Sequence, residues 1–250
     1  MKTLENVRYT GEHPRQVLDV YLPDGEVRCV FLYIHGGGLD HGSKDGYAAW
    51  APELTSHGIA FVASNYRLYP DAKYPEFIED SAHAVAYARN LARELGTDNL
   101  YVCGSSAGGY MTMMLCFDTS YLKNVGVDPS EVKGYLHDAG QPTAHFAVLK
   151  ERGIDSRRVI IDDTAPLYFF GLEEKYPPMR FIVSDNDMKN RYEQTMLVLS
   201  TLNHFGYTNY DHVVMHGKHC QYNRAGENGE LAPMVGMIKD FVNHVENIKE

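Results

Sequence analysis

The sequence of 250 residues predicts an α/β fold in which a mostly parallel central sheet carries helices on both faces. Apolar runs of strand length alternate along the chain with segments of helical periodicity. The clearest run, residues 27–34, is almost continuously apolar, as a strand buried on both sides should be. Because no repeat, low-complexity tract or linker divides the sequence, we predict one domain over residues 1–250.

The predicted strands are spaced so that helices fit between them. A short alternating segment at residues 17–21 is predicted to form an antiparallel edge hairpin with residues 7–9. The strands of the parallel sheet are then predicted from the apolar runs at residues 27–34, 59–64, 100–103, 132–136, 180–183 and 212–215.

Helical periodicity is clearest from residue 75 to residue 95, where apolar and small residues recur on one stripe. Pro75 suits the first turn of this helix, and Gly96 suits the position after its end. Further helices are predicted at residues 107–117, 190–205 and 231–247. The segment 118–163 fits the alternation least well, so we expect it to form a small cap over the loop end of the sheet.

The composition excludes some classes of partner. The 23 Lys and Arg residues are outnumbered by 33 Asp and Glu residues, a net charge of −10, which disfavours nucleic acid and anionic membranes. No stretch approaches the ~20 apolar residues that span a bilayer, and the N-terminus lacks the apolar segment of a secretory signal. We therefore expect a cytoplasmic protein whose cysteines are free thiols: Cys29, Cys103, Cys116 and Cys220.

The strongest chemical signal is the glycine-rich segment at residues 104–109, which lies between a predicted strand and a predicted helix. It fits the pattern G-x-S-x-G with Ser106 as the central serine. A serine at such a sharp turn needs small neighbours two positions away, and Gly104 and Gly108 meet that need. Ser106 is therefore the candidate nucleophile.

A second signal is the run of three glycines that follows His35 at the end of the first apolar strand. Such a run costs conformational entropy, so its presence needs a reason. The backbone N–H groups of Gly37 and Gly38, together with that of Ala107, could converge on the oxygen of a tetrahedral intermediate. We interpret them as an oxyanion hole, and we expect His35 to organise the loop.

A serine nucleophile then requires a base and an orienting carboxylate farther along the chain. His219 follows the last predicted strand, and Asp187 follows the strand before it, so the order Ser, Asp, His is present. Asp185 and Asp138 remain alternatives for the acid, and His216 remains an alternative for the base.

The last part of the sequence also holds several potential metal ligands. His212, His216, His219 and Cys220 are residue types found in zinc sites. A strand followed by a turn would point these side chains in different directions. We therefore expect no metal site, and the mechanism that the serine suggests requires no cofactor.

Several segments together resemble the α/β-hydrolase serine esterases of the hormone-sensitive-lipase-like kind. They are LDVYLP at residues 18–23, HGGG at 35–38, NYRLYP at 65–70, PEFIED at 75–80 and GSSAGG at 104–109. The chain is especially similar to the compact branch that includes bacterial feruloyl and acetylxylan esterases and the aryl formamidases. The resemblance implies an α/β-hydrolase fold with Ser106 as nucleophile, His219 as base, Asp187 as acid, and Gly37, Gly38 and Ala107 as oxyanion donors.

This resemblance implies a small-molecule ester as substrate, with a short or aromatic acyl group, and it includes acylated oligosaccharides among the candidate substrates. Candidate pocket residues are Leu39, Tyr110, Met188 and Tyr222. An aryl formamidase or a small peptidase would use the same triad, and a catalytically silent binding module would keep only the scaffold. The sequence alone does not decide between these hypotheses and an esterase.

Overall fold

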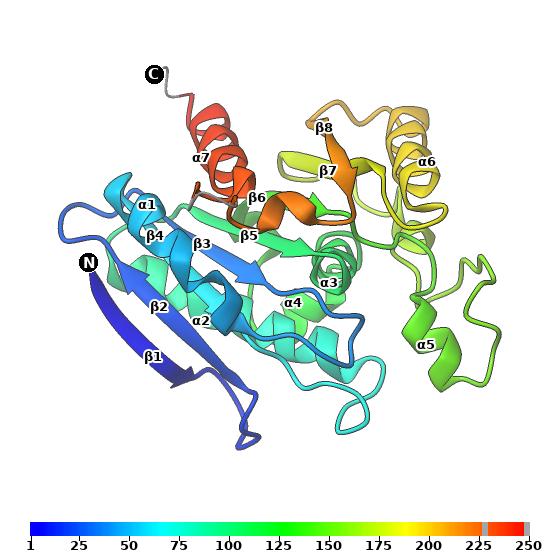
Figure 1. Cartoon of the computed structure of the whole chain (residues 1–250), viewed down its shortest axis with the longest axis horizontal. Coiled ribbons are helices and arrows are strands. Elements are labelled where there is room, and N and C mark those ends of the chain that lie inside the picture. Colours follow the sequence, from blue (N-terminus) through cyan, green and yellow to red (C-terminus); the bar gives the residue numbers. More distant parts are fainter. Residues whose placement is uncertain (227–229, 248–250) are drawn as a thin grey trace.

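The computed structural model describes residues 1–226 and 230–247, and within them the chain forms one eight-stranded sheet (Figure 1). The strand order is β1-β2-β4-β3-β5-β6-β7-β8. The first two strands, β1 (Lys2–Arg8) and β2 (Val17–Leu22), are antiparallel, as the predicted edge hairpin requires. The others are parallel to one another: β3 (Cys29–Ile34), β4 (Ile59–Ser64), β5 (Leu100–Ser105), β6 (Val132–Asp138), β7 (Met179–Asn186) and β8 (Tyr210–Lys218).

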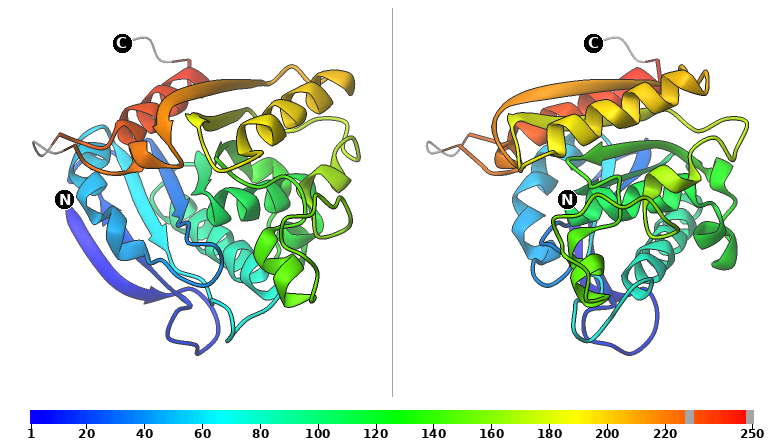
Figure 2. Two further views of the ribbon diagram at one scale, coloured as in Figure 1. Left: turned by 45° about the vertical axis from the view of Figure 1, so that its right-hand side comes forward. Right: turned by 90° about the vertical axis from the view of Figure 1, so that its right-hand side faces the viewer.

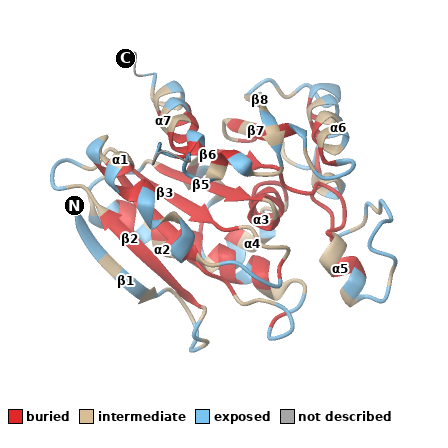
Figure 3. Ribbon diagram, viewed as in Figure 1, coloured by how far each residue is buried: buried red, intermediate tan, exposed pale blue. Residues whose placement is uncertain are grey.

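Helices cover both faces of this sheet, which confirms the predicted fold class (Figure 2). On one face α2 (Glu76–Glu94), α3 (Ala107–Phe117) and α6 (Arg191–His204) share a core with alternate residues of β3. On the other face α1 (Ala51–Ser56) and α7 (Pro233–Val245) pack on the remaining residues of that strand. The central strands are therefore buried on both sides (Figure 3), which explains why they are apolar at nearly every position.

The predicted long helices and the structure agree to within two residues at each end. Three short helices were not predicted: α1, α4 (Ser120–Asn124) and α5 (Phe146–Glu151). Each has six residues or fewer, which is less than two turns, so no apolar stripe can repeat within it. The 3-10 turns η1 (Lys44–Trp50), η2 (Pro129–Glu131), η3 (Pro166–Phe169) and η4 (Gln221–Asn223) complete the connections.

The boundaries of the predicted cap need correction. The segment 118–163 was expected to lie over the sheet, but its first part contains α4, η2 and all of β6, which is an inner strand of the sheet. The segment that leaves the sheet runs from residue 139 to residue 178 and carries α5 and η3. It extends beyond the carboxyl ends of the strands at the right of Figure 1. The strand at residues 132–136 was itself predicted; the error was to assign it to the cap together with the polar turns on either side of it.

The four cysteines are free, as predicted, and Cys29, Cys103 and Cys116 are buried. Burial raises the pKa of each of these three thiols well above its ordinary value, so they remain neutral members of the core. In the part of the chain that the structure describes, no helix has the length and apolar character needed to cross a membrane.

Candidate active site

Ser106 lies at the turn between the end of β5 and the start of α3, in a backbone conformation that few residues other than glycine adopt (φ 56°, ψ −112°). A Cβ on Gly108 would lie 2.1 Å from the carbonyl oxygen of Ile34. A Cβ on Gly104 would lie 2.4 Å from the carbonyl oxygen of Gly108. Only glycine fits at either position, which confirms the close backbone approach expected around Ser106.

We predict that Gly108→Ala lowers the free energy of unfolding by at least about 2 kcal/mol, because the new methyl group must displace the backbone of β3. Urea denaturation measures this change. The matched control is Gly236→Ala in α7, where an added Cβ meets nothing within 4 Å. That substitution is expected to raise the free energy of unfolding by roughly 0.5–1 kcal/mol. Equal effects of the two substitutions would contradict the prediction.

The imidazole of His219 lies between Ser106 and Asp187. Its Nε2 is 2.8 Å from the Oγ of Ser106, and its Nδ1 is 2.5 Å from an Oδ of Asp187. These three side chains come from segments that follow three different strands of the sheet. The arrangement allows the Ser106 hydroxyl to donate to Nε2 while Nδ1–H donates to the carboxylate.

Asp187 is held in place by the backbone around it. Its side chain is fully buried, and it accepts hydrogen bonds from the N–H groups of Met188 (2.7 Å) and Ser184 (3.2 Å). Burial raises the pKa of this carboxyl, but the hydrogen bonds with His219 and the two backbone donors outweigh burial and leave the pKa below its ordinary value. The carboxylate is therefore ionised and oriented toward His219.

The alternative acid and base residues lie elsewhere. Asp185 and His216 pair with each other at 2.7 Å on the exposed surface. Asp138 is fully buried and accepts a hydrogen bond from Ser105, the residue before the candidate nucleophile. The structure thus brings together Ser106, His219 and Asp187.

The glycine loop runs directly beside Ser106. A Cβ on Gly36 would lie 3.0 Å from the Cβ of Ser106. Gly37 and Gly38 have φ values of 125° and 61°, in the region that favours glycine. Ala107 is the first residue of α3, so its N–H is among those at the helix start that face away from the helix. All three predicted oxyanion donors therefore lie on segments that border the serine.

His35 lies beneath this loop as the organising residue that the sequence suggested. Its Nδ1–H donates to the Gly36 carbonyl (2.6 Å), and its Nε2 accepts from the Arg15 guanidinium (3.2 Å). Its ring stacks on Tyr66 with the centroids 4.4 Å apart. Burial lowers the pKa of His35 to about 4, so the ring is neutral and holds one tautomer.

The predicted substrate-contacting residues need correction at three of four positions. Leu39, Tyr110 and Tyr222 are almost completely buried in the two cores and present no surface to a substrate. The hydroxyl of Tyr110 donates to the carbonyl of Thr164 (2.8 Å), so this residue anchors the segment 139–178 between β6 and β7. Met188 is exposed beside Asp187 and remains a candidate.

Sequence reasoning missed Phe146 at the start of α5. Its ring lies against the glycine loop, with Cζ 3.4 Å from the position of a Cβ on Gly38. Gly38 and Phe146 are far apart in the sequence, and the segment 139–178, which carries Phe146, has no motif that indicates where it folds. The ring of Phe146 reaches the site only because the segment 139–178 turns back toward the ends of β3 and β5.

The potential zinc ligands do not all gather at one point, although Cys220 Sγ lies 3.7 Å from His219 Nε2. His212 and His216 lie on β8, whereas His219 is engaged with Ser106 and Asp187. Among residues 1–226 and 230–247, no group of three or more His, Cys, Asp or Glu side chains is gathered as a metal site would require.

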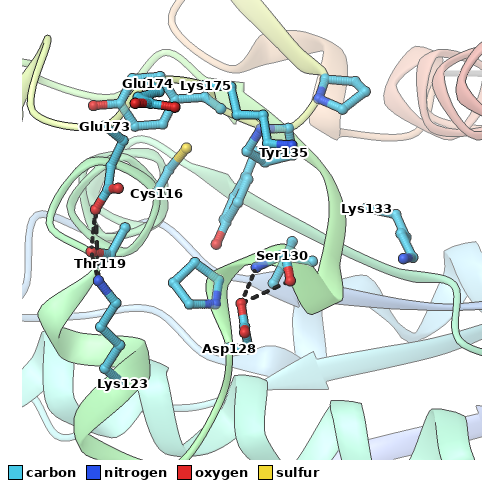
Figure 4. A pocket seen from close by; sticks show the side chains of 15 residues that line it. Cys116, Thr119, Lys123, Asp128, Ser130, Lys133, Tyr135, Glu173, Glu174 and Lys175 are labelled. Carbon is cyan, nitrogen blue, oxygen red and sulfur yellow. Dashed lines mark hydrogen bonds and ion pairs between the residues drawn. The ribbon is translucent and has the colours of Figure 1, made fainter.

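A cavity of about 660 Å³ lies on the far side of the molecule, near the amino end of β6, whereas Ser106 lies near its carboxyl end. Figure 4 shows the hydroxyl of Tyr135 in this cavity, between the walls that carry Thr119 and Ser130. Within the described residues this buried hydroxyl has no hydrogen-bond partner. The cavity is therefore separate from the candidate active site.

This orphaned hydroxyl leads to a stability prediction. Tyr135→Phe should leave the free energy of unfolding unchanged or raise it by up to about 1 kcal/mol, because it removes a buried polar atom that has no partner. Tyr110→Phe is the matched control, since it would leave the buried carbonyl of Thr164 without its donor and should cost about 1–3 kcal/mol. Denaturant titrations compare the two, and a larger loss for Tyr135→Phe would refute the assignment.

The sheet order, the helices on both faces and the sharp serine turn define an α/β-hydrolase fold. Residues 18–149, which are more than half of the chain, match the BD-FAE family. The chain belongs to the BD-FAE family.

The chain is similar in sequence to two curated proteins. The chain is 27% identical over 143 residues to a probable isoprenylcysteine alpha-carbonyl methylesterase, ICMEL2 of Arabidopsis thaliana, covering 52% of this chain and 33% of that protein. It is 30% identical over 116 residues to the kynurenine formamidase of Salmo salar, covering 46% of this chain and 38% of that protein. The chain thus spans about a third of the length of these relatives.

The structure is similar over nearly its whole length to esterase B from Lactobacillus Rhamnosis. The TM-score is 0.76 with 19% identity, and the match covers 98% of this chain and 86% of the other. At this level of identity the similarity concerns the fold.

Proposed function

We propose that the protein is a serine hydrolase that cleaves carboxylic esters through an acyl-enzyme. The observation that carries this proposal is the hydrogen-bonded series Asp187, His219 and Ser106 at the carboxyl ends of parallel strands, beside a glycine loop. Membership of the BD-FAE family and the methylesterase among its relatives support ester hydrolysis.

In the proposed mechanism each group has its own step. The Oγ of Ser106 attacks the ester carbonyl carbon while Nε2 of His219 takes its proton, 2.8 Å away. Asp187 stabilises the imidazolium through Nδ1–H, and the N–H groups of Gly37, Gly38 and Ala107 receive the developing oxyanion. The imidazolium then protonates the leaving alcohol, and the acyl group stays on Ser106.

Hydrolysis of the acyl-enzyme repeats these steps with water. His219 removes a proton from the water molecule, which attacks the acyl carbonyl, and the proton then passes to Ser106 as the acid is released. These steps need no metal or organic cofactor.

The proposed substrates are esters with short or aromatic acyl groups, such as acetyl or feruloyl esters of carbohydrates. The ring of Phe146 beside Gly38 limits the space next to the proposed oxyanion donors, which favours compact or flat acyl groups. A long aliphatic chain would need a channel past this ring. The exposed side chain of Met188, the residue after Asp187, offers further apolar surface.

Formamide hydrolysis is a second candidate, and the fish kynurenine formamidase among the relatives favours it. The same triad would attack an N-formyl carbonyl, and the proton would pass to an amine instead of an alcohol.

A substrate panel tests these alternatives. We expect aryl acetates, methyl ferulate and acetylated xylo-oligosaccharides to be hydrolysed with higher kcat/KM than palmitoyl esters or N-formylkynurenine. A preference for N-formylkynurenine by more than tenfold would favour formamidase activity, and a preference for palmitoyl esters would refute the compact acyl site.

A non-catalytic binding module would keep the scaffold without the chemistry. Labelling by a fluorophosphonate probe separates the two possibilities, because the probe reacts only with an activated serine. We expect the label on Ser106, and failure of the folded protein to react would overturn the proposal.

A further inference from the structure

A buried carboxyl is hydrogen-bonded both to the turn that carries Ser106 and to the loop that carries His219. Asp138 is the last residue of β6, and its side chain is completely shielded from solvent. Its carboxylate accepts hydrogen bonds from Ser105 Oγ, from the hydroxyl of Tyr222, and from the Nδ2 of Asn223 at 2.8 Å. The sequence placed Asp138 among the possible triad acids, yet these contacts assign its carboxylate other partners.

On one side this carboxylate holds the turn that carries Ser106. Ser105 is the residue immediately before the candidate nucleophile, and its Oγ also accepts a hydrogen bond from Tyr33 OH on β3 (2.7 Å). The backbone N–H of Ser106 donates to the carbonyl oxygen of Asp138 at 2.7 Å. The backbone and the side chain of Asp138 therefore both fix this turn.

On the other side the same carboxylate holds the loop that carries His219. This loop leaves β8 at Lys218, passes through His219 and Cys220, and enters the short turn that contains Tyr222 and Asn223. Gln221 is exposed, so Tyr222 and Asn223 supply the inward contacts of that turn. Asn223 Nδ2 also lies 2.9 Å from Ser105 Oγ, which links the loop directly to the nucleophile turn.

Because the carboxyl of Asp138 is buried, the loss of any of these hydrogen bonds would cost free energy. Burial raises the pKa of Asp138, and the hydrogen bonds from Ser105, Tyr222 and Asn223 oppose that rise. A buried carboxyl that loses one of these donors incurs a desolvation cost, so the loop and the turn are held together by more than packing.

We propose that Asp138, acting through Tyr222 and Ser105, is a positioning residue that sets the distance between His219 and Ser106. The inference rests on the proposed function, since it concerns the geometry of that site. Asp138 touches neither the substrate nor the imidazole in this role. It keeps Nε2 within hydrogen-bond reach of Oγ by tying the loop and the turn to one rigid strand end.

The test is Tyr222→Phe, which removes one of the two loop donors to Asp138, leaves that of Asn223, and keeps the ring in the core. We expect kcat for an aryl acetate to fall by roughly 10- to 100-fold, because small misplacement of a catalytic group has effects of this size. KM should stay within about twofold, since no substrate contact changes.

The matched control is Tyr101→Phe. Tyr101 is also buried, and its hydroxyl also faces a carboxylate, that of Glu246 at 3.4 Å, but it lies at the opposite end of β5 from Ser105. We expect its kcat to match that of the unaltered protein. An equal fall in kcat for both variants would show a general effect of removing buried hydroxyls and would overturn the proposal.

A spectroscopic readout makes the test independent of hydrolysis. The proton between His219 Nδ1 and Asp187 should give a far-downfield ¹H NMR resonance, because the two atoms are 2.5 Å apart and the carboxylate is buried. Tyr222→Phe and Asp138→Asn should broaden or remove this resonance, whereas Tyr101→Phe should keep it. A sharp, unshifted resonance in Tyr222→Phe, with unchanged kcat, would refute the positioning role.

These readouts separate the two proposals. If the unaltered protein shows the downfield resonance but hydrolyses no ester and resists the fluorophosphonate, the proposed function fails while the loss of the resonance in Tyr222→Phe still supports positioning. Should Asp138→Asn fold poorly, Tyr222→Phe still decides the question because its ring is retained. Where both fold, their effects on kcat are expected to be less than additive, since both disturb the hydrogen bond between Tyr222 and Asp138; full additivity would contradict the positioning role.

Discussion

Ser106→Ala is expected to lower kcat for hydrolysis of p-nitrophenyl acetate by at least about 10⁴-fold, because it removes the only atom that the proposed mechanism bonds to the acyl group. The substitution deletes a half-buried hydroxyl and leaves the sharp turn with its glycine neighbours in place. Thermal unfolding should therefore show a folded protein. Steady-state kinetics on both proteins measure the loss.

Labelling by the fluorophosphonate should disappear in the same variant. Ser130→Ala is the control, since its hydroxyl belongs to a surface turn near the amino end of β6 and donates to Asp128. That variant should keep full activity and labelling. Hydrolysis by Ser106→Ala at the rate of the unaltered protein would mean that another group is the nucleophile.

Asp187→Asn is expected to have the second-largest effect, a fall in kcat of roughly 10³- to 10⁴-fold. An amide at this position cannot stabilise the imidazolium by charge, and its NH₂ group favours the wrong tautomer of His219. The Met188 and Ser184 N–H groups that now donate to the carboxylate would retain only one acceptor oxygen. Kinetics with the aryl acetate and labelling rates with the fluorophosphonate measure the loss.

Asp185→Asn is the matched control because the same change is made two residues away. Asp185 pairs with the exposed His216 and accepts from the Gly217 N–H, so its carboxylate has partners outside the candidate triad. We expect kcat within about twofold of the unaltered protein, as exposed pairs contribute little. If Asp185→Asn were the more damaging substitution, the assignment of the acid would have to be reversed.

Much of the fold and the candidate triad could be predicted from the sequence because they depend on local patterns. A strand buried on both faces must be apolar along its length, and β3 and β4 follow this rule. The turn at Ser106 needs glycine on either side whatever surrounds it. Parallel strands all end at one edge of the sheet, so residues that follow β5, β7 and β8 could be expected to meet.

The walls of the site could not be predicted in the same way. Tyr110 and Tyr222 are amphipathic residues that follow Ser106 and His219 within about one helical turn in the sequence, which made them plausible contacts for a substrate. A tyrosine can turn toward the cleft or into the core, and neighbouring carbonyl or carboxylate groups decide between the two. Here the Thr164 carbonyl and the Asp138 carboxylate accept hydrogen bonds from the hydroxyls of the two tyrosines inside the protein.

The sequence by itself determined which chemical groups this protein can bring to one end of the sheet, because backbone sterics and hydrophobic burial act over a few residues and leave a readable pattern. The tertiary structure alone decided which of the competing carboxylates faces His219. It also placed Phe146 beside the glycine loop and turned Asp138 toward Tyr222. These outcomes depend on contacts between segments that are distant along the chain, and the identity of a residue does not specify the partner that it meets.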